Sequence, residues 1–252
     1  MDLELEAAAA TEAAVMVGPM LRRCFENGVV ETRSKAVRQD VVTQADLDAE
    51  QAIIGHLRSK WPEDGFLGEE SGSSDGTSAR VWCVDPLDGT ANFAAGYPRW
   101  AVAIALLIRG EAVLAVTFDP LREEIFVARE VVGLTSGPGL SNMRAVARIE
   151  DALVADNRPY DHREPAQPLE MEFRRSRGRR ESGSMALDFA WLAAGRLDVV
   201  SYERSERLWD YIGGELLVAQ AGGEIRIADP ARDIAVAASP ELVEYLCPTK
   251  DE

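Results

Sequence analysis

Two aspartates three residues apart, Asp85 and Asp88, end an apolar run and begin the part of the chain with the strongest chemical character. Residues 82–93 read Trp-Cys-Val-Asp-Pro-Leu-Asp-Gly-Thr-Ala-Asn-Phe. The proline between the aspartates predicts that the chain leaves its strand there, so that both carboxylates converge on one point. Gly89 and Thr90 would then offer backbone N–H groups at a helix start, a favourable place for a phosphate. The alternative interpretation is an ordinary Asp-Pro, Asp-Gly turn with a capping aspartate.

Three further acidic residues, Glu69, Asp210 and Asp46, are candidates to join this pair. Each also has an ordinary explanation. Glu69 belongs to a Gly-Glu-Glu run that is typical of surface charge. Asp210 begins a predicted helix and suits an N-cap. Asp46 follows Thr43 by three residues, which fits a capping box.

The spacing around Asp85 excludes one rival chemistry. Phosphatases of the haloacid dehalogenase type place a nucleophilic aspartate two residues before a second aspartate and four before a threonine. Here the corresponding offsets, to Asp88 and Thr90, are three and five. The two aspartates are therefore interpreted as metal ligands and not as a covalent nucleophile.

Cysteine and histidine contribute little to the expected site. Cys24, Cys83 and Cys247 are widely spaced and odd in number, which argues against a disulfide framework and a zinc cluster. His56 and His162 are too few for a histidine-rich centre. Any metal must then be a hard cation on oxygen ligands.

The composition predicts a globular chain. It has 252 residues, 46% of them hydrophobic, which is enough for a real core. The acidic first residues lack the features of a signal peptide, and no apolar run approaches the roughly 20 residues of a membrane span. A net charge of −16 disfavours nucleic-acid binding by the surface as a whole. We expect a cytoplasmic protein with no membrane or nucleic-acid partner.

One basic segment contrasts with this charge, because five arginines lie within residues 174–180. Two interpretations stay open: a solvated strand edge or loop, and a lip that attracts anionic substrates. An acidic enzyme with an anionic substrate needs local positive charge, which bound metal ions also supply.

The elements that must position these residues alternate along the chain, with three strands in the middle forming an antiparallel meander. No linker is long enough to separate independent domains. One compact unit is expected, with an N-terminal α+β half over 1–140 that carries the metal-binding motifs and a C-terminal α/β half over 141–252 that closes the active site. Helices are predicted over 3–26, 43–60, 184–194, 210–220 and from Pro240; strands over 65–67, 81–84, 100–108, 112–118, 124–129, 152–155, 198–202, 224–227 and 234–238; loops over 71–78 and 133–142.

Taken together, these segments resemble the inositol monophosphatase family of magnesium-dependent, lithium-sensitive phosphatases. The resemblance covers about residues 35–225, and the combination of Asp-Pro-Leu-Asp-Gly-Thr with Trp-Asp is its most specific part. The matching segments are Lys35, Asp40–Asp46, Gly68–Ser71, Asp85–Thr90 with Asn92-Phe93, Gly183–Leu187, Ala193–Asp198, Glu203-Arg204, Trp209-Asp210 and Ala221–Gly223.

The resemblance implies two to three Mg²⁺ ions, with Asp85 bridging two of them and a weaker third ion on Glu69. The implied metal ligands are Glu69, Asp85, the backbone carbonyl of Leu87, Asp88 and Asp210. The implied catalytic residues are Asp46, Glu69 and Thr90, of which Thr90 and Asp46 would orient and deprotonate the attacking water. The implied substrate contacts are Asp88, Gly89, Thr90, Gly183, Ser184 and Glu203.

Physical chemistry is consistent with these roles. Uncatalysed hydrolysis of a phosphate monoester is among the slowest known reactions, so the site must stabilise much charge. Two Mg²⁺ ions can neutralise both the attacking and the leaving oxygen. Four carboxylates packed together repel one another, so divalent ions are required at neutral pH.

The resemblance also implies a fold and a class of substrate. The expected fold is α/β (α+β), a layered αβαβα sandwich of the inositol monophosphatase and fructose-1,6-bisphosphatase type, in a homodimer. The expected reaction is hydrolysis of inositol monophosphate, favoured by Asn92-Phe93 followed by Gly96-Tyr97-Pro98. Fructose 1,6-bisphosphate or a range of sugar phosphates comes next, then histidinol phosphate. A non-enzymatic alternative is a metal-binding regulatory protein that kept the fold.

Three departures from the family pattern bear on substrate choice and subunit contact. The stretch after residue 129 lacks the usual glycine-rich turn ending in Asn-Gly, and Ser205 stands where glycine is common. The segment Tyr211–Gly214 replaces a more alanine-rich helix start, and a Thr-Asp element often found after Gly223 is absent. None of these positions is an implied metal ligand.

Overall fold

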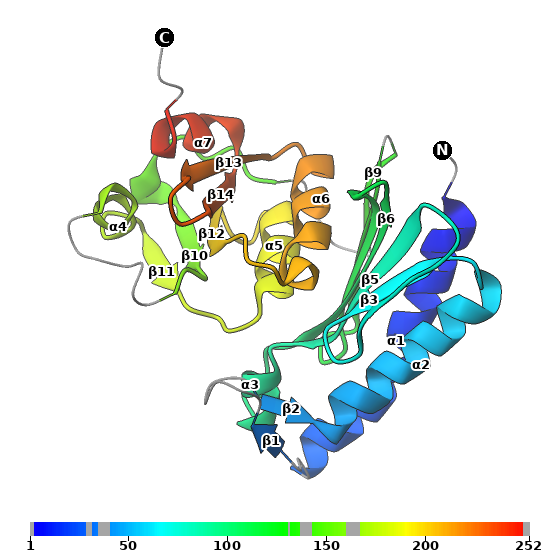
Figure 1. Ribbon diagram of the computed structural model, residues 1–252. Coiled ribbons are helices and arrows are strands. Elements are labelled where there is room, and N and C mark those ends of the chain that lie inside the picture. Colours follow the sequence, from blue (N-terminus) through cyan, green and yellow to red (C-terminus); the bar gives the residue numbers. More distant parts are fainter. Residues whose placement is uncertain are drawn as a thin grey trace.

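The computed structural model describes residues 3–28, 32–34, 41–130, 132–136, 143–159 and 167–248. In this part of the chain two mixed β-sheets alternate with three layers of helices (Figure 1). Helices α1 and α2 cover the outer face of the larger sheet, α5 and α6 lie between the sheets, and α4 and α7 cover the far face of the smaller sheet. The predicted αβαβα order is confirmed.

The larger sheet has seven strands in the order β4-β3-β5-β6-β7-β8-β9. Only β3 and β5 pair in parallel; the other neighbours are antiparallel, so the predicted meander is confirmed. The strands are β3 (Gly65–Gly68), β4 (Gly72–Ser74), β5 (Arg80–Asp88), β6 (Ala101–Ile108), β7 (Glu111–Asp119), β8 (Glu124–Arg129) and β9 (Gly133–Ser136).

Two stretches that the sequence predicts as loops, 71–78 and 133–142, each contain an edge strand of this sheet. Strand β4 folds back on β3 through Gly72, whose φ of 71° suits glycine. Strand β9 pairs with β8. An edge strand needs only backbone partners on one side, so small and polar residues can form it. Residues 137–142 lie outside the described part of the chain.

The prediction that the chain leaves its strand after Asp85 was wrong. Strand β5 continues to Asp88, and its register against β6 shifts between the two aspartates, from Asp85 opposite Ala103 to Asp88 opposite Ala101. This bulge explains how a proline is accommodated, because an unpaired position needs no N–H group. The bulge keeps both aspartates in the strand and still bends it between them.

Helices α1 (Glu4–Asn27) and α2 (Gln44–Lys60) pack on the larger sheet through a continuous apolar cluster. Trp82, Val84, Ile104 and Val116 contribute the sheet side of this cluster. A short antiparallel pair, β1 (Thr32–Ser34) and β2 (Val41–Thr43), leads into the start of α2. The sequence predicts both helices but not this pair.

The smaller sheet has five strands in the order β11-β10-β12-β14-β13. Strands β11, β10 and β12 are parallel, whereas β12, β14 and β13 are antiparallel. Its strands are β10 (Leu153–Asp156), β11 (Gly178–Arg180), β12 (Val199–Glu203), β13 (Glu224–Asp229) and β14 (Ile234–Ala238). The accompanying helices are α4 (Pro168–Phe173), α5 (Met185–Ala193), α6 (Ile212–Gln220) and α7 (Pro240–Leu246), with single turns η1 (Ile149–Asp151) and η3 (Leu208–Asp210).

Strand β11 and helix α4 were not predicted, and β11 overlaps the basic segment. Along β10 and β12 the apolar side chains alternate, so that Val154 and Val199 face α4 and α7 while Ala155 and Val200 face α5 and α6. The smaller sheet is therefore covered on both faces. The division of the chain near residue 140 stays a prediction.

The two sheets approach closely because α6 begins with small residues. A Cβ atom on Gly214 would lie 2.2 Å from the ring of Phe189 in α5. A Cβ atom on Gly213 would contact Ala105 and Ala115 of the larger sheet. The glycines that replace an alanine-rich helix start thus let α6 fit between α5 and the sheet.

None of the helices in the described residues combines the length and the apolar character that a bilayer crossing requires.

Candidate active site

A cavity of about 160 Å³ opens where the end of β5 meets the segments before α5 and α6. All four acidic residues expected to ligate metal line it, although they come from three distant parts of the sequence. The lining residues are Glu69, Asp85, Leu87, Asp88, Gly89, Thr90, Ala91, Gly183, Arg207 and Asp210.

The bulge of β5 supplies the centre of this cavity. Asp85 is 2% exposed, and its Oδ1 accepts a hydrogen bond from the backbone N–H of Leu87 at 3.0 Å. The hydroxyl of Thr90 lies 3.0 Å from the Leu87 carbonyl oxygen and 3.0 Å from Oδ1 of Asp46. Asp46 is buried and comes from the first turn of α2. The buried Asp46 carboxylate thus accepts a hydrogen bond from a residue that lines the cavity.

The three other acids of the cavity act electrostatically on Asp85. Burial raises the pKa of Asp85 well above its usual value, and the nearby carboxylates of Glu69, Asp88 and Asp210 raise it further. Burial also raises the pKa of Asp88 to about 6, although three hydrogen bonds oppose that rise. Neither Asp85 nor Asp88 forms an ion pair within the described residues. A cavity of this kind favours protons or metal cations.

Asp88 is held by the start of α5. Its Oδ2 accepts hydrogen bonds from the hydroxyl of Ser184 and from the backbone N–H of Ala186, and its Oδ1 accepts one from the N–H of Met185 at 3.1 Å. A carboxylate oxygen has two lone pairs, so Oδ1 keeps one for a cation. Ser184 is fully buried and reaches the site only through Asp88.

The donor set suits a hard divalent cation such as Mg²⁺. It consists of carboxylate and carbonyl oxygens, and the buried acids are destabilised by their mutual charge. Within the described residues no three His, Cys, Asp or Glu side chains are close enough together to form a ready-made metal site. Metal binding would therefore draw these carboxylates closer together than they lie here.

Two facing glycines bring the halves together at this point. Gly89 precedes α3 (Thr90–Ala94) with φ 91°, and a Cβ atom there would lie 3.0 Å from the Gly183 carbonyl oxygen. Gly183 has φ 72°, and a Cβ atom there would lie 2.9 Å from the Asn92 amide. That amide donates hydrogen bonds to the carbonyl oxygens of Arg99 and Ser182, both at 2.8 Å. Side chains at either glycine would separate the halves.

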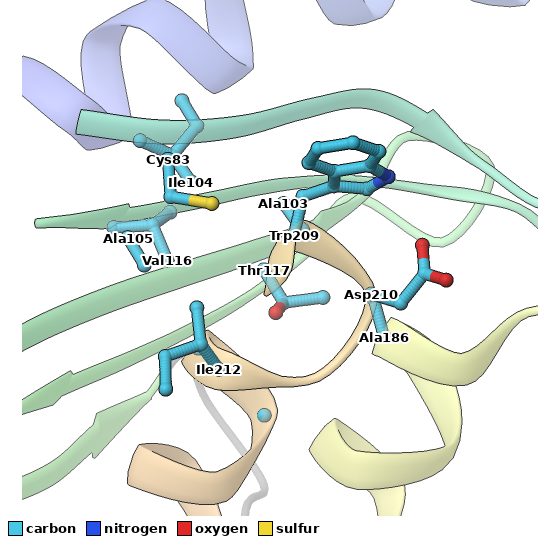
Figure 2. Close-up of a pocket in the computed structure, with 12 residues that line it drawn as sticks. Cys83, Ala103, Ile104, Ala105, Val116, Thr117, Ala186, Trp209, Asp210 and Ile212 are labelled. Atoms are coloured by element: carbon cyan, nitrogen blue, oxygen red, sulfur yellow. The ribbon is translucent and has the colours of Figure 1, made fainter. Parts of the chain in front are cut away.

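Asp210 reaches the cavity from the turn η3, immediately before α6. The N-cap residue of α6 is Tyr211, so Asp210 is not the helix cap that its position suggested. Figure 2 shows the small neighbouring pocket, in which Trp209 lies against the larger sheet and the Asp210 carboxylate extends away from Ile212. Cys83 lines the same pocket, and burial, with the charges of Asp85 and Asp210, raises its pKa to about 12.

The sequence missed two residues that line the cavity, Ala91 and Arg207. Three expected residues do not line it: Asp46, Ser184 and Glu203. Asp46 and Ser184 instead contact the lining residues Thr90 and Asp88. Glu203, at the end of β12, is half-buried but lies outside the lining. Arg207 is exposed and is the single cationic side chain of the lining among the residues that the structure describes. The sequence feature that could have identified Arg207 is its position three residues before Asp210. Lys35 and Asp40, which begin the family match, and His162 lie outside the described residues.

The basic segment 174–180 does not reach this cavity, because none of its residues belongs to the lining. Arg175 pairs with Glu150 and Glu172, and Arg179 pairs with Asp156 and Glu170. These pairs favour the structural interpretation of the segment over a lip that attracts substrate.

Comparison with known proteins agrees with this geometry. The model of the "Inositol monophosphatase family" matches residues 2–249. The inositol-1-monophosphatase of Caulobacter vibrioides is 36% identical over 226 residues, 86% of this chain and 88% of that protein. The Nus factor SuhB of Escherichia coli is 36% identical over 220 residues, 85% and 82% of the two chains.

A crystal structure of the extragenic suppressor protein suhB from Bartonella henselae is also similar. It superimposes with a TM-score of 0.87 at 30% identity and covers 97% of this chain and 98% of that one. The expected family, fold and enzyme class are confirmed. The chain belongs to the inositol monophosphatase family and is a phosphatase of that family.

Proposed function

We propose that this protein hydrolyses small phosphate monoesters with the help of Mg²⁺, and that inositol monophosphate is its preferred substrate. The observation that carries the proposal is the convergence of Glu69, Asp85, Asp88 and Asp210 on one cavity beside the start of α3. Fold alone does not require such convergence, because one fold serves many functions.

Each part of the cavity has a proposed task. Two to three Mg²⁺ ions would be held by Glu69, Asp85, the Leu87 carbonyl, Asp88 and Asp210. Bound Mg²⁺ would supply the positive charge that a reacting phosphate needs.

The chain's own groups would perform the remaining steps. The N–H groups of Gly89 and Thr90 would hold the phosphate oxygens. The Thr90 hydroxyl, in contact with Asp46 at 3.0 Å, would orient the attacking water and pass its proton toward that carboxylate. Ser184 would keep Asp88 directed into the cavity, where Asp88 and Gly183 would also contact the substrate. Glu203 would reach the substrate hydroxyls from the rim.

The choice of substrate is supported by one relative and one stretch of sequence. The Caulobacter relative is named as an inositol-1-monophosphatase. The stretch Asn92–Pro98 follows the pattern expected for enzymes acting on inositol monophosphates. Fructose 1,6-bisphosphate, other sugar phosphates and histidinol phosphate are the alternatives, in that order.

Phosphate release from a panel of esters tests this function. The panel contains inositol 1-phosphate, fructose 1,6-bisphosphate and histidinol phosphate, each assayed with and without Mg²⁺. We expect Mg²⁺-dependent release with the highest kcat/KM for inositol 1-phosphate. A higher kcat/KM for another ester would overturn the substrate assignment, and no release from any ester by folded protein would overturn the enzymatic proposal.

A regulatory role is the alternative that the Escherichia coli relative keeps open, because that protein is named as a Nus factor. If the panel shows no release, binding of RNA and of protein partners becomes the next measurement. The homodimer and the cytoplasmic location stay predictions, which sedimentation and cell fractionation can test.

A further inference from the structure

Helix α2 carries two buried carboxylates, Asp46 and Glu50, which are four residues apart and therefore lie on one face of the helix. Asp46 contacts the Thr90 hydroxyl. Glu50 is 3% exposed and is not part of the cavity lining. None of the roles assigned so far explains why the helix buries a second acid here.

The carboxylate of Glu50 binds the turn that follows β3. Its Oε2 accepts a hydrogen bond from the backbone N–H of Glu70 at 2.9 Å, and its Oε1 accepts one from the N–H of Ser71 at 2.8 Å. The turn crosses the carboxylate so closely that a Cβ atom on Gly68 would lie 2.5 Å from Oε2. The absence of a side chain at Gly68 thus leaves the space that the Glu50 carboxylate occupies.

Glu69 directly precedes the two residues that Glu50 binds, and it makes a backbone hydrogen bond of its own to β5. Its own backbone N–H donates to the carbonyl oxygen of Val84 at 3.1 Å, directly before Asp85. The backbone of Glu69 is thus bound to β5 on one side, and the residues after it are bound to α2 on the other. These contacts fix where the Glu69 side chain leaves the backbone relative to Asp85.

We propose that Glu50 is a positioning residue, which orients Glu69 toward Asp85 and thereby sets the affinity of the cavity for a divalent cation. This inference rests on the proposed function. Carboxylates that orient metal ligands typically change metal affinity by about 10- to 100-fold when they are replaced. Two backbone N–H groups bind the Glu50 carboxylate, and the proposed contribution of Glu50 to the cavity is the position of the turn that carries Glu69.

The test compares Glu50→Gln with Asp48→Asn. Glutamine has nearly the same shape but offers only one acceptor oxygen, so one of the two N–H groups loses its partner. Asp48 is exposed on the same helix, and Asp48→Asn removes the same charge without touching the turn. Glu50→Asp is the second variant, because it keeps the charge and shortens the reach.

Two measurements are made on the full-length protein. Isothermal titration calorimetry with Mg²⁺ should show a Kd about tenfold higher in Glu50→Gln and in Glu50→Asp, and an unchanged Kd in Asp48→Asn. Hydrogen exchange should show faster exchange of the Glu70 and Ser71 amides in both Glu50 variants. The kcat of both variants should return to at least half of the wild-type value at saturating Mg²⁺.

The outcomes separate this inference from the proposed function. An unchanged Mg²⁺ affinity in folded Glu50 variants, whatever the exchange rates, overturns the positioning role. An equal loss of affinity in Asp48→Asn also overturns it, because general charge would then be the cause. A wild-type protein that binds Mg²⁺ but releases no phosphate overturns the proposed function alone. If Glu50→Gln does not fold, Glu50→Asp decides by the same criteria.

Discussion

Two groups of buried carboxylates, one in each half of the molecule, differ in how their charge is balanced. In the smaller sheet Asp156 is bound by Arg158 at 2.9 Å and by Arg179 at 2.6 Å. Burial alone raises the pKa of Asp156, but the hydrogen bonds and charges of these arginines, with Ser201, bring it below the usual value. At the end of β5 burial and neighbouring acids raise the pKa of Asp85 and Asp88 instead.

This difference distinguishes a structural use of buried acids from a functional one. A carboxylate whose counter-charge belongs to the fold strengthens the fold when it is ionised. A carboxylate buried among other acids destabilises the fold unless a cation or proton arrives from outside. Two aspartates that are equally buried can therefore have different roles, and the charges of the neighbouring side chains distinguish these roles. Three substitutions and one pH series test this distinction.

Replacing an acid of the cavity should have the largest effect on activity. Asp85→Asn removes a ligand from the centre of the site, and we expect kcat with Mg²⁺ to fall by about a thousandfold. The metal-free variant should be at least as stable as the wild type, because a buried, repelled charge is lost. Phosphate release and urea unfolding measure the two quantities. Near-wild-type activity would contradict the assignment of Asp85.

Replacing an acid of the smaller sheet should have the opposite effect: stability should fall and activity should stay nearly unchanged. Asp156→Asn leaves Arg158 buried without its nearest counter-charge, so the free energy of unfolding should fall by about 3 kcal/mol. The kcat of the folded fraction should stay close to that of the wild type. Asp229→Asn, at a half-buried and solvent-accessible pair with Arg232, is the control and should change stability less. Equal losses in both variants would remove the distinction.

A third experiment concerns a buried acid whose partner is a hydroxyl group. Thr90→Val keeps the shape of the side chain but removes the oxygen that contacts Asp46 and the Leu87 carbonyl. We expect kcat to fall by about a hundredfold with little change in KM, because a proton-transfer contact is lost. Thr11→Val on α1 is the control. An increase in KM alone would show that Thr90 only binds the phosphate.

The smallest expected effect is one of pH. Because the pKa of Asp88 is raised to about 6, its protonated form competes with metal as the pH falls through that value. Metal-free protein should gain stability from Asp85 and Asp88 over the same fall, since the folded state prefers the proton. The increase in Tm caused by Mg²⁺ should then be smaller at about pH 5 than at about pH 7.5. An equal increase at both values would count against a site built on these acids.

Much of the site was open to prediction from sequence, because its acids belong to short motifs. The spacing within one short segment predicts that its functional groups lie together, as it does for Asp85, Asp88, Gly89 and Thr90. The long helices and the central meander follow from hydrophobic periodicity in the same way. Glu50 was not predicted, since a glutamate in an amphipathic helix has no local sign of the turn that it binds. Strands β4, β9 and β11 were missed because edge pairing depends on a partner strand and not on composition.

The amino-acid sequence specifies which chemical groups are available: oxygen ligands, a proline that cannot donate a backbone hydrogen bond, and glycines where the chain passes close to its neighbours. Which acids meet depends on the tertiary structure. Asp156 and Asp85 are both aspartates at or near the end of an apolar strand, yet arginines surround one and carboxylates the other. The physical reason is that the pKa of a buried group depends on charges a few ångströms away, and these come from segments far along the chain.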